Sequence, residues 1–168
     1  RFIEDQSRRY APILIDELSQ YFKIYNRRYW QQLIQTGGYS DEDTAQRSIN
    51  QYVNGKDNYS RHDAVKAVIS IFNRFSEENI DPSQVSTNDP NLSSLLSMYS
   101  YYKNSLIINP KLQSVDFSLL QQKAWQAFCS CQDSQNVFKH IIIDEYQDTN
   151  SIQEAIFFEL SKGSKNLC

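Results

Sequence analysis

The segment "HIIIDEYQDTN" (His140–Asn150) joins three consecutive isoleucines directly to two adjacent carboxylates. Together with the preceding residues it forms a short, β-branched and mostly apolar run, "VFKHIIID" at 137–144, typical of a strand covered on both faces in a parallel sheet. After the acidic residues, "SIQE" (151–154) offers a capping box for a helix that would stop near Gly163. The order strand, acidic loop, helix is one half of a βαβ unit.

The two acids at the end of this strand predict a phosphate-handling site. Ligands of open α/β sheets bind beyond the carboxyl ends of the strands, where Asp144 and Glu145 emerge. Adjacent carboxylates repel each other unless a positive group lies beside them, and Mg²⁺ bridging nucleotide phosphates is a candidate because it uses one or two protein carboxylates. A second acid next to the metal ligand can orient or deprotonate an attacking water. The alternative is a solvated acidic turn.

The first 130 residues predict an all-helical unit. Apolar residues recur there at three- and four-residue steps, and turn formers separate the stripes. We therefore expect a mainly α fold, with a helical subdomain at 1–130 and a strand-loop-helix piece of an α/β motor domain at 131–168. The expected helices are one long helix from Pro12 to about Gln35, one from a Ser40 cap to about Val53, one capped by Ser60, one over Leu92–Leu106, and one capped by Asp116.

The composition indicates which kinds of protein this chain can be. Of the 168 residues, 40% are hydrophobic and 22% are charged, which is typical of a globular domain, and no apolar run or signal peptide suggests a membrane partner. The net charge of -3 supplies no overall positive field for nucleic acid. Three cysteines without a disulfide framework indicate a reducing compartment, so we expect a cytoplasmic location. Neither the cysteines nor the two histidines have the spacing of a zinc site.

Many of the 11 tyrosines invite a base-stacking interpretation, because aromatic faces bind single strands. Tyr21, Tyr25, Tyr99 and Tyr102 nevertheless fall on helix stripes, which favours core packing. The cluster 27–30, "RRYW", could meet DNA, but an amphipathic helix end explains it as well.

The segment "IIIDEYQDTNSIQ" (141–153) resembles the Walker B segment, motif II, of the UvrD/Rep-type superfamily 1 DNA helicases, and it matches the family pattern at every position through Gln153. Those proteins are ATP-driven motors that move on single-stranded DNA. "VDFSLL" (115–120) is similar to the family's L-D-F-D-D-L-L segment and departs from it at Ser118, while "YSYYKNSL" (99–106) resembles its Tyr-rich helix. The helices between Pro12 and Pro110 fit in position the helical insertion subdomain 1B. The final "NLC" resembles the lead-in to the motif III strand.

The resemblance implies roles for six residues of the loop. Asp144 would hold Mg²⁺, and Glu145 would be the catalytic base for the water that attacks the γ-phosphate. Gln147 and Asp148 would couple the nucleotide site to neighbouring motifs; we group Gln147 with Glu145 as catalytic and Asp148 with Asp144 as cofactor-binding. Thr149 and Asn150 would shape the loop. ATP and Mg²⁺ would be the cofactors of the full-length parent, and single-stranded and duplex DNA its partners.

The sequence lacks the phosphate cradle G-x-x-x-x-G-K-[ST] that ATP hydrolysis needs. Its only Gly-Lys pair, Gly55-Lys56, is followed by Asp57, and Asn50 stands where the first glycine belongs. The chain also begins with Arg1 rather than Met. We therefore expect an internal piece of an ATP-dependent DNA helicase, inactive alone, whose 141–143 strand either self-associates through unpaired backbone groups or is poorly ordered. A second interpretation is a non-enzymatic helical interaction module or a degenerate relative. The pathway, whether repair, replication restart or recombination, stays open.

Overall fold

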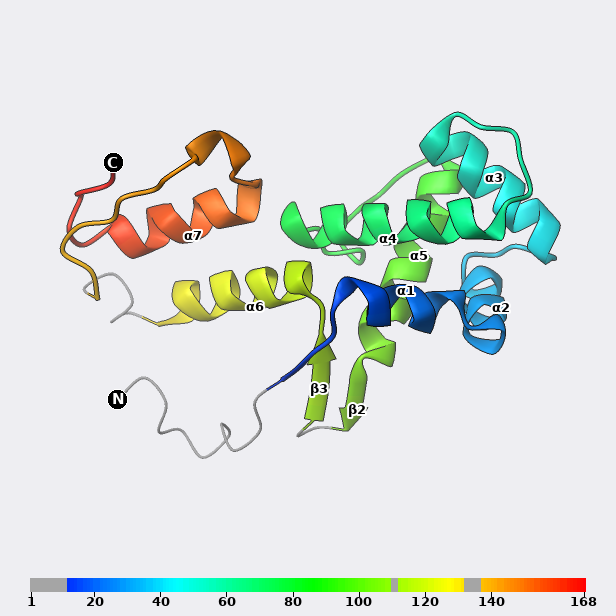
Figure 1. Cartoon of the computed structure of the whole chain (residues 1–168), viewed down its shortest axis with the longest axis horizontal. Coiled ribbons are helices and arrows are strands. Elements are labelled where there is room, and N and C mark those ends of the chain that lie inside the picture. The colour runs from blue at the N-terminus through cyan, green and yellow to red at the C-terminus, as the bar shows by residue number, and fades with distance from the viewer. Residues whose placement is uncertain (1–11, 110–111, 132–136) are drawn as a thin grey trace. The chain divides into compact units, whose positions relative to one another are not determined.

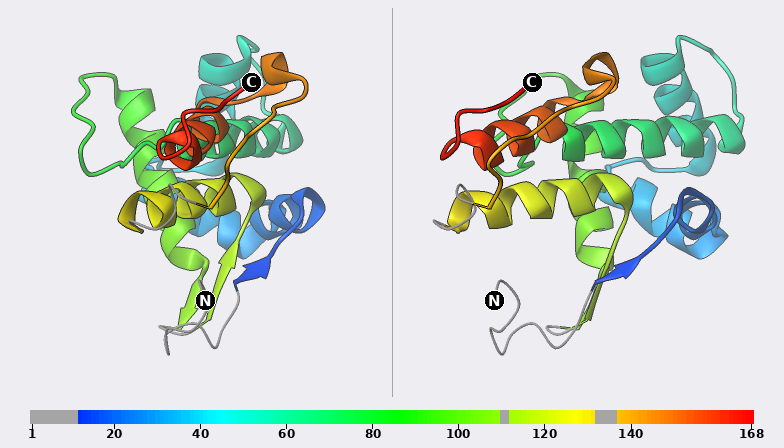
Figure 2. Two further views of the ribbon diagram at one scale, coloured as in Figure 1. Left: turned by 90° about the vertical axis from the view of Figure 1, so that its left-hand side faces the viewer. Right: turned by 60° about the vertical axis from the view of Figure 1, so that its left-hand side comes forward.

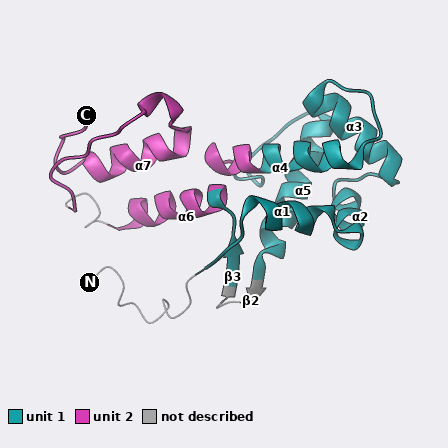
Figure 3. Ribbon diagram, viewed as in Figure 1, with its two compact units in different colours: residues 1–72, 81–117 teal, residues 73–80, 118–168 magenta. Residues whose placement is uncertain are grey.

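A computed structural model describes residues 12–109, 112–131 and 137–168. The chain divides into two compact units (Figure 3). Unit 1 comprises Arg1–Phe72 with Asp81–Phe117, and unit 2 comprises Asn73–Ile80 with Ser118–Cys168. Both units are built mainly from helices (Figure 1), which confirms the mainly α prediction. No helix in the described ranges has the length and apolar character needed to cross a membrane.

The prediction of a single helix over residues 12–35 is wrong. This part of the chain forms β1 (Ile13–Leu14), α1 (Glu17–Tyr25) and α2 (Arg27–Thr36). Asn26 separates the two helices with a φ of -55° and a ψ of 127°. Its side-chain oxygen accepts hydrogen bonds from the backbone N–H groups of Arg28 and Tyr29 at 3.1 and 3.2 Å. Asn26 is therefore an N-cap that starts a new helix, although the apolar stripe continues across it.

The other helices of unit 1 begin at capping residues. Ser60 accepts a hydrogen bond from the backbone N–H of Asp63 at 3.2 Å, as predicted for this cap. The cap expected at Ser40 is instead Asp41, which accepts from the backbone N–H of Thr44 at 2.7 Å. The helices are α3 (Glu42–Asn54), α4 (Arg61–Glu77), whose last turns belong to unit 2, and α5 (Pro90–Ser105) with Asp89 as its cap.

Unit 1 also holds a small three-stranded sheet that the helical prediction missed. Its strands are β1, β2 (Ile107–Asn109) and β3 (Leu112–Val115), in the order β1-β3-β2. Strand β1 pairs in parallel with β3, with Ile13 opposite Ser114, whereas β2 and β3 are antiparallel neighbours (Figure 1). The sheet joins the start of the described chain to the segment that precedes Asp116.

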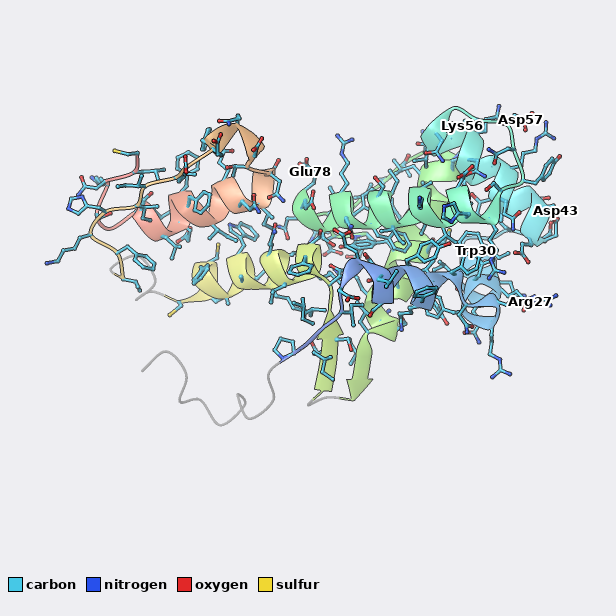
Figure 4. The ribbon with its side chains drawn as sticks, viewed as in Figure 1. Arg27, Trp30, Asp43, Lys56, Asp57 and Glu78 are labelled. Carbon is cyan, nitrogen blue, oxygen red and sulfur yellow. The ribbon has the colours of Figure 1, made fainter. Side chains whose placement is uncertain are left out.

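Aromatic side chains fill the core of unit 1. Trp30, Phe72, Tyr99 and Tyr102 are completely buried. The ring of Phe72 lies 5.5 Å from that of Tyr99 and 5.2 Å from that of Tyr102. The core role predicted for these two tyrosines is confirmed, but Tyr25 is 39% exposed on α1. Because the side chain of Trp30 (labelled in Figure 4) is completely buried, it has no exposed surface with which to contact DNA.

Unit 2 is built from the end of α4, helix α6 (Phe117–Ser130), the 3-10 turn η3 (Tyr146–Asp148) and α7 (Ser151–Ser161). Helix α7 runs alongside α6 in both views of Figure 2. The thiol of Cys129 on α6 lies 3.9 Å from the carboxylate of Glu159 on α7, and burial raises the pKa of this thiol.

The strand expected at 137–144 is reduced to an isolated bridge. Ile141 pairs in parallel with Leu167, and three backbone hydrogen bonds of 2.8–3.0 Å join 141–143 to 166–168. The parallel direction agrees with the prediction, but coverage of both faces does not, because Ile142 is 83% exposed. The partner of this segment is the chain's own end, so within unit 2 part of its backbone is already paired.

Candidate functional site

The acidic loop, defined here as Asp144–Asn150, lies between this parallel bridge and the first turn of α7. One end is held where the backbone N–H of Ile143 donates to the carbonyl of Cys168 at 2.8 Å. The loop thus leaves the carboxyl end of a parallel-paired segment, the position where α/β folds bind ligands. Asp144 and Glu145 directly follow this paired segment.

Glu145 has a left-handed backbone conformation, with a φ of 55° and a ψ of 47°. A residue with a Cβ atom rarely adopts this region, because the Cβ crowds the following carbonyl. The conformation starts the 3-10 turn, in which the backbone N–H of Asp148 donates to the Glu145 carbonyl at 2.9 Å and that of Thr149 donates to the Tyr146 carbonyl at 3.0 Å. The chain therefore turns sharply at the residue expected to be the catalytic base.

The structure brings two of the four predicted site residues into contact. The side-chain amide of Gln147 donates to the carboxylate of Glu145, and both side chains are exposed. Asp144 and Asp148 are also exposed, and neither carboxylate has a hydrogen-bond or ion-pair partner within the described part of the chain. Asp144 is thus open to a ligand, whereas the Glu145 carboxylate is oriented by its neighbour.

The capping box at the end of the loop lies one residue earlier than predicted. Asn150, not Ser151, is the N-cap of α7. Its side-chain oxygen accepts from the backbone N–H of Gln153 at 2.9 Å, and the Gln153 side chain accepts from the Asn150 N–H at 3.1 Å. Both partners of the reciprocal bond are present, so the loop ends at a defined residue. Glu154, the expected partner in the box, instead accepts a hydrogen bond from the Tyr146 hydroxyl.

Residues outside the motif support the loop, and the sequence pattern did not identify them. The side-chain amide of Asn150 donates to Gln121 on α6 at 3.1 Å. Ser151 donates to the carboxylate of Glu78 (Figure 4) at 3.4 Å. Helix α6 is itself joined to the end of α4 and the turn that follows it, because Ser118 donates to Glu77 at 2.9 Å and Gln122 to Asn79 at 3.1 Å. A residue that acts through such long-range contacts has no local pattern.

The carboxylate oxygens of the loop are better suited to Mg²⁺ that is also bound by phosphates than to a cation bound by protein alone. No group of three or more histidine, cysteine, aspartate or glutamate side chains suited to a metal occurs among the described residues. Mg²⁺ keeps several waters and takes one or two carboxylates plus substrate phosphates, which matches an exposed Asp144 that has no partner among the described residues. The ion pairs found in the described ranges, Arg47–Asp57, Arg61–Glu42 and Lys162–Glu159, do not involve the loop.

Comparison with known proteins gives one family match. The model of the UvrD/REP helicase N-terminal domain matches residues 2–168. Neither the curated proteins nor the solved structures contain a match to this chain. The matched range includes the acidic loop, the capped helix after it and the helical region before it. The chain belongs to the UvrD/REP helicase N-terminal domain family.

Proposed function

We propose that this chain supplies the Walker B segment of an ATP-dependent DNA helicase, a motor that couples ATP hydrolysis to movement on single-stranded DNA and to duplex unwinding. The observation that carries the proposal is the pair of acids at the carboxyl end of the parallel bridge. Asp144 is exposed and unpaired among the described residues, and Glu145 follows in a left-handed turn. This arrangement suits a cation beside a catalytic base.

Four residues of the loop have a proposed part in hydrolysis. Asp144 would hold Mg²⁺, and the bound ion would neutralise charge on the phosphate oxygens. The Glu145 carboxylate accepts the proton of the attacking water, and the hydrogen bond from Gln147 keeps that carboxylate oriented. Asp148 belongs to the nucleotide-binding group, and its backbone N–H closes the turn onto Glu145.

The proposal keeps the division into a helical subdomain at 1–130, similar in position to subdomain 1B, and a motor-domain segment at 131–168. ATP hydrolysis also needs a phosphate cradle, and the 168 residues contain no G-x-x-x-x-G-K-[ST] sequence. We therefore expect no ATP turnover from this polypeptide alone. Activity belongs to a longer protein that carries both the cradle and this loop.

The decisive experiment measures ATP turnover by the full-length protein with and without single-stranded DNA. Three versions are compared: wild type, Glu145→Gln, and Asp43→Asn as a control. Asp43 is an exposed acid in the first turn of α3 (Figure 4), so its substitution removes one negative charge far along the chain from the loop. We expect DNA-stimulated turnover in the wild type and the control, and a loss of at least about a hundredfold in Glu145→Gln.

Two results would contradict the proposal. Turnover by the 168-residue chain that disappears in Glu145→Gln would show that no separate phosphate cradle is required. A folded full-length protein without turnover would instead favour a non-enzymatic helical interaction module that retains the helicase pattern.

A further inference from the structure

We propose that Gln121 on α6 is a positioning residue for the acidic loop, acting through Asn150. The loop is held at two ends, by the parallel bridge before Asp144 and by Asn150 at the start of α7. Among the residues that the structure describes, the second end is tied by a side chain from another helix, through the 3.1 Å hydrogen bond between Asn150 and Gln121. The catalytic consequence of this contact rests on the proposed function.

The hydrogen bonds around Asn150 allow one orientation of its side-chain amide. Its side-chain oxygen must accept the backbone N–H of Gln153 at 2.9 Å, because that N–H is a donor only. The other end of the amide is therefore the NH₂ group, which donates, and the Gln121 oxygen must face it. Aspartate could cap α7 equally well but has no donor for Gln121, and in serine or threonine one oxygen would have to serve as both the cap acceptor and the donor. Gln121 thus gives a physical reason for asparagine at this position.

Gln121 can transmit a fixed position because α6 is anchored on the same side. Its neighbours on the first turns of α6, Ser118 and Gln122, are buried and bind the end of α4 and the turn that follows it. Ser118 donates to Glu77 and Gln122 donates to Asn79. The α4 end, α6 and the cap of α7 therefore form one hydrogen-bonded frame within unit 2. The loop residues between the frame and the bridge, 144–149, include Glu145.

The test compares the same substitution at two glutamines of α6. Gln121→Met removes the acceptor for Asn150 while keeping the length of the side chain. Gln126→Met makes the same change at an exposed glutamine of α6 that is not one of the residues bonded to Asn150, Glu77 or Asn79. Gln121→Glu retains an acceptor oxygen and is the conservative rescue. Each substitution is made in the 168-residue chain and in the full-length protein.

In the 168-residue chain, amide exchange with water is followed by NMR at Gln153, Glu154 and Thr149. These amides donate to Asn150 or to the 3-10 turn of the loop. We expect exchange about fivefold faster in Gln121→Met, the size expected for one lost hydrogen bond. Exchange at the same amides should match the wild type in Gln126→Met and return toward it in Gln121→Glu.

In the full-length protein, ATP turnover separates positioning from general stability. We expect Gln121→Met to lower kcat about tenfold with KM unchanged, as is typical when a residue that orients a catalytic group is lost. Unchanged amide exchange, or equal effects of both methionine variants, overturns the positioning role. Altered exchange with an unaltered kcat in an active protein also overturns it. No turnover in the wild type is a different result, because there the proposed function itself fails.

Discussion

The hydroxyl of Tyr102 donates a 2.7 Å hydrogen bond to the carboxylate of Asp116, and both side chains are buried. Gln20 on α1 donates to the same two groups at 3.1 and 3.3 Å. The three residues come from α1, from α5 and from the junction between β3 and α6. Asp116 belongs to the "VDF" segment, so this part of the family resemblance has a structural role within unit 1.

Removal of the Tyr102 hydroxyl should destabilise the chain at neutral pH. In Tyr102→Phe, the buried Asp116 loses a short hydrogen bond, and bonds to charged groups contribute about 1.5–3 kcal/mol. We expect the free energy of unfolding in urea to fall by about 2 kcal/mol. Tyr101→Phe is the control, because Tyr101 donates to Gln32 at an exposed site and its loss should cost under about 1 kcal/mol. Equal losses in both variants would contradict a special role for the buried network.

Alkaline pH should weaken the fold through the same tyrosine. Burial raises the pKa of Tyr102 above its ordinary value of 10.0, and the Asp116 charge adds to the shift. Above about pH 10 the unfolded chain therefore releases this proton while the folded chain keeps it, so unfolding is favoured as pH rises. One such group contributes a slope of up to about 1.4 kcal/mol per pH unit. Urea unfolding between pH 9 and 11 should show a shallower decline in Tyr102→Phe than in the wild type.

A contact in the structure accounts for the serine at position 118, where the family pattern has aspartate. Ser118 is 6% exposed and donates to Glu77 at 2.9 Å, so an aspartate there would place two carboxylates against each other. We expect Ser118→Asp to lower the free energy of unfolding by about 1–3 kcal/mol. Glu77→Gln should restore most of that loss when the two changes are combined, because the amide can donate to the new carboxylate. A double-mutant cycle with an interaction energy near zero would refute the contact.

The acidic loop was predictable because its chemistry is contained in contiguous residues. An apolar run, two acids and a capping residue follow one another within 141–153, and each feature acts over a few positions. The exact N-cap was not predictable, since Asn150 and Ser151 are both good capping residues. The N-cap that forms, Asn150, also bonds Gln121, which lies 29 positions away and is not part of any local pattern.

The break at Asn26 and the small sheet were missed for related reasons. Tyr21, Tyr25 and Tyr29 keep their helical spacing across Asn26, so the periodicity conceals two helices separated by a single residue. Strand β1 has two residues and pairs with residues about 100 positions later, a length too short to produce a pattern of its own. Such elements form because tertiary contacts outweigh weak local preferences.

The left-handed conformation of Glu145 gives the last prediction. A residue with a Cβ atom in this region costs about 1–2 kcal/mol, and glycine avoids most of that cost. We expect Glu145→Gly to raise the free energy of unfolding by up to about 1 kcal/mol while abolishing ATP turnover in the full-length protein. Glu145→Ala is the control, because it removes the carboxylate without relieving the backbone. If both variants change stability equally, the gain comes from the lost charge and not from the backbone. A stability gain confined to glycine would mean that the loop keeps a strained glutamate for its carboxylate, as functional sites often do.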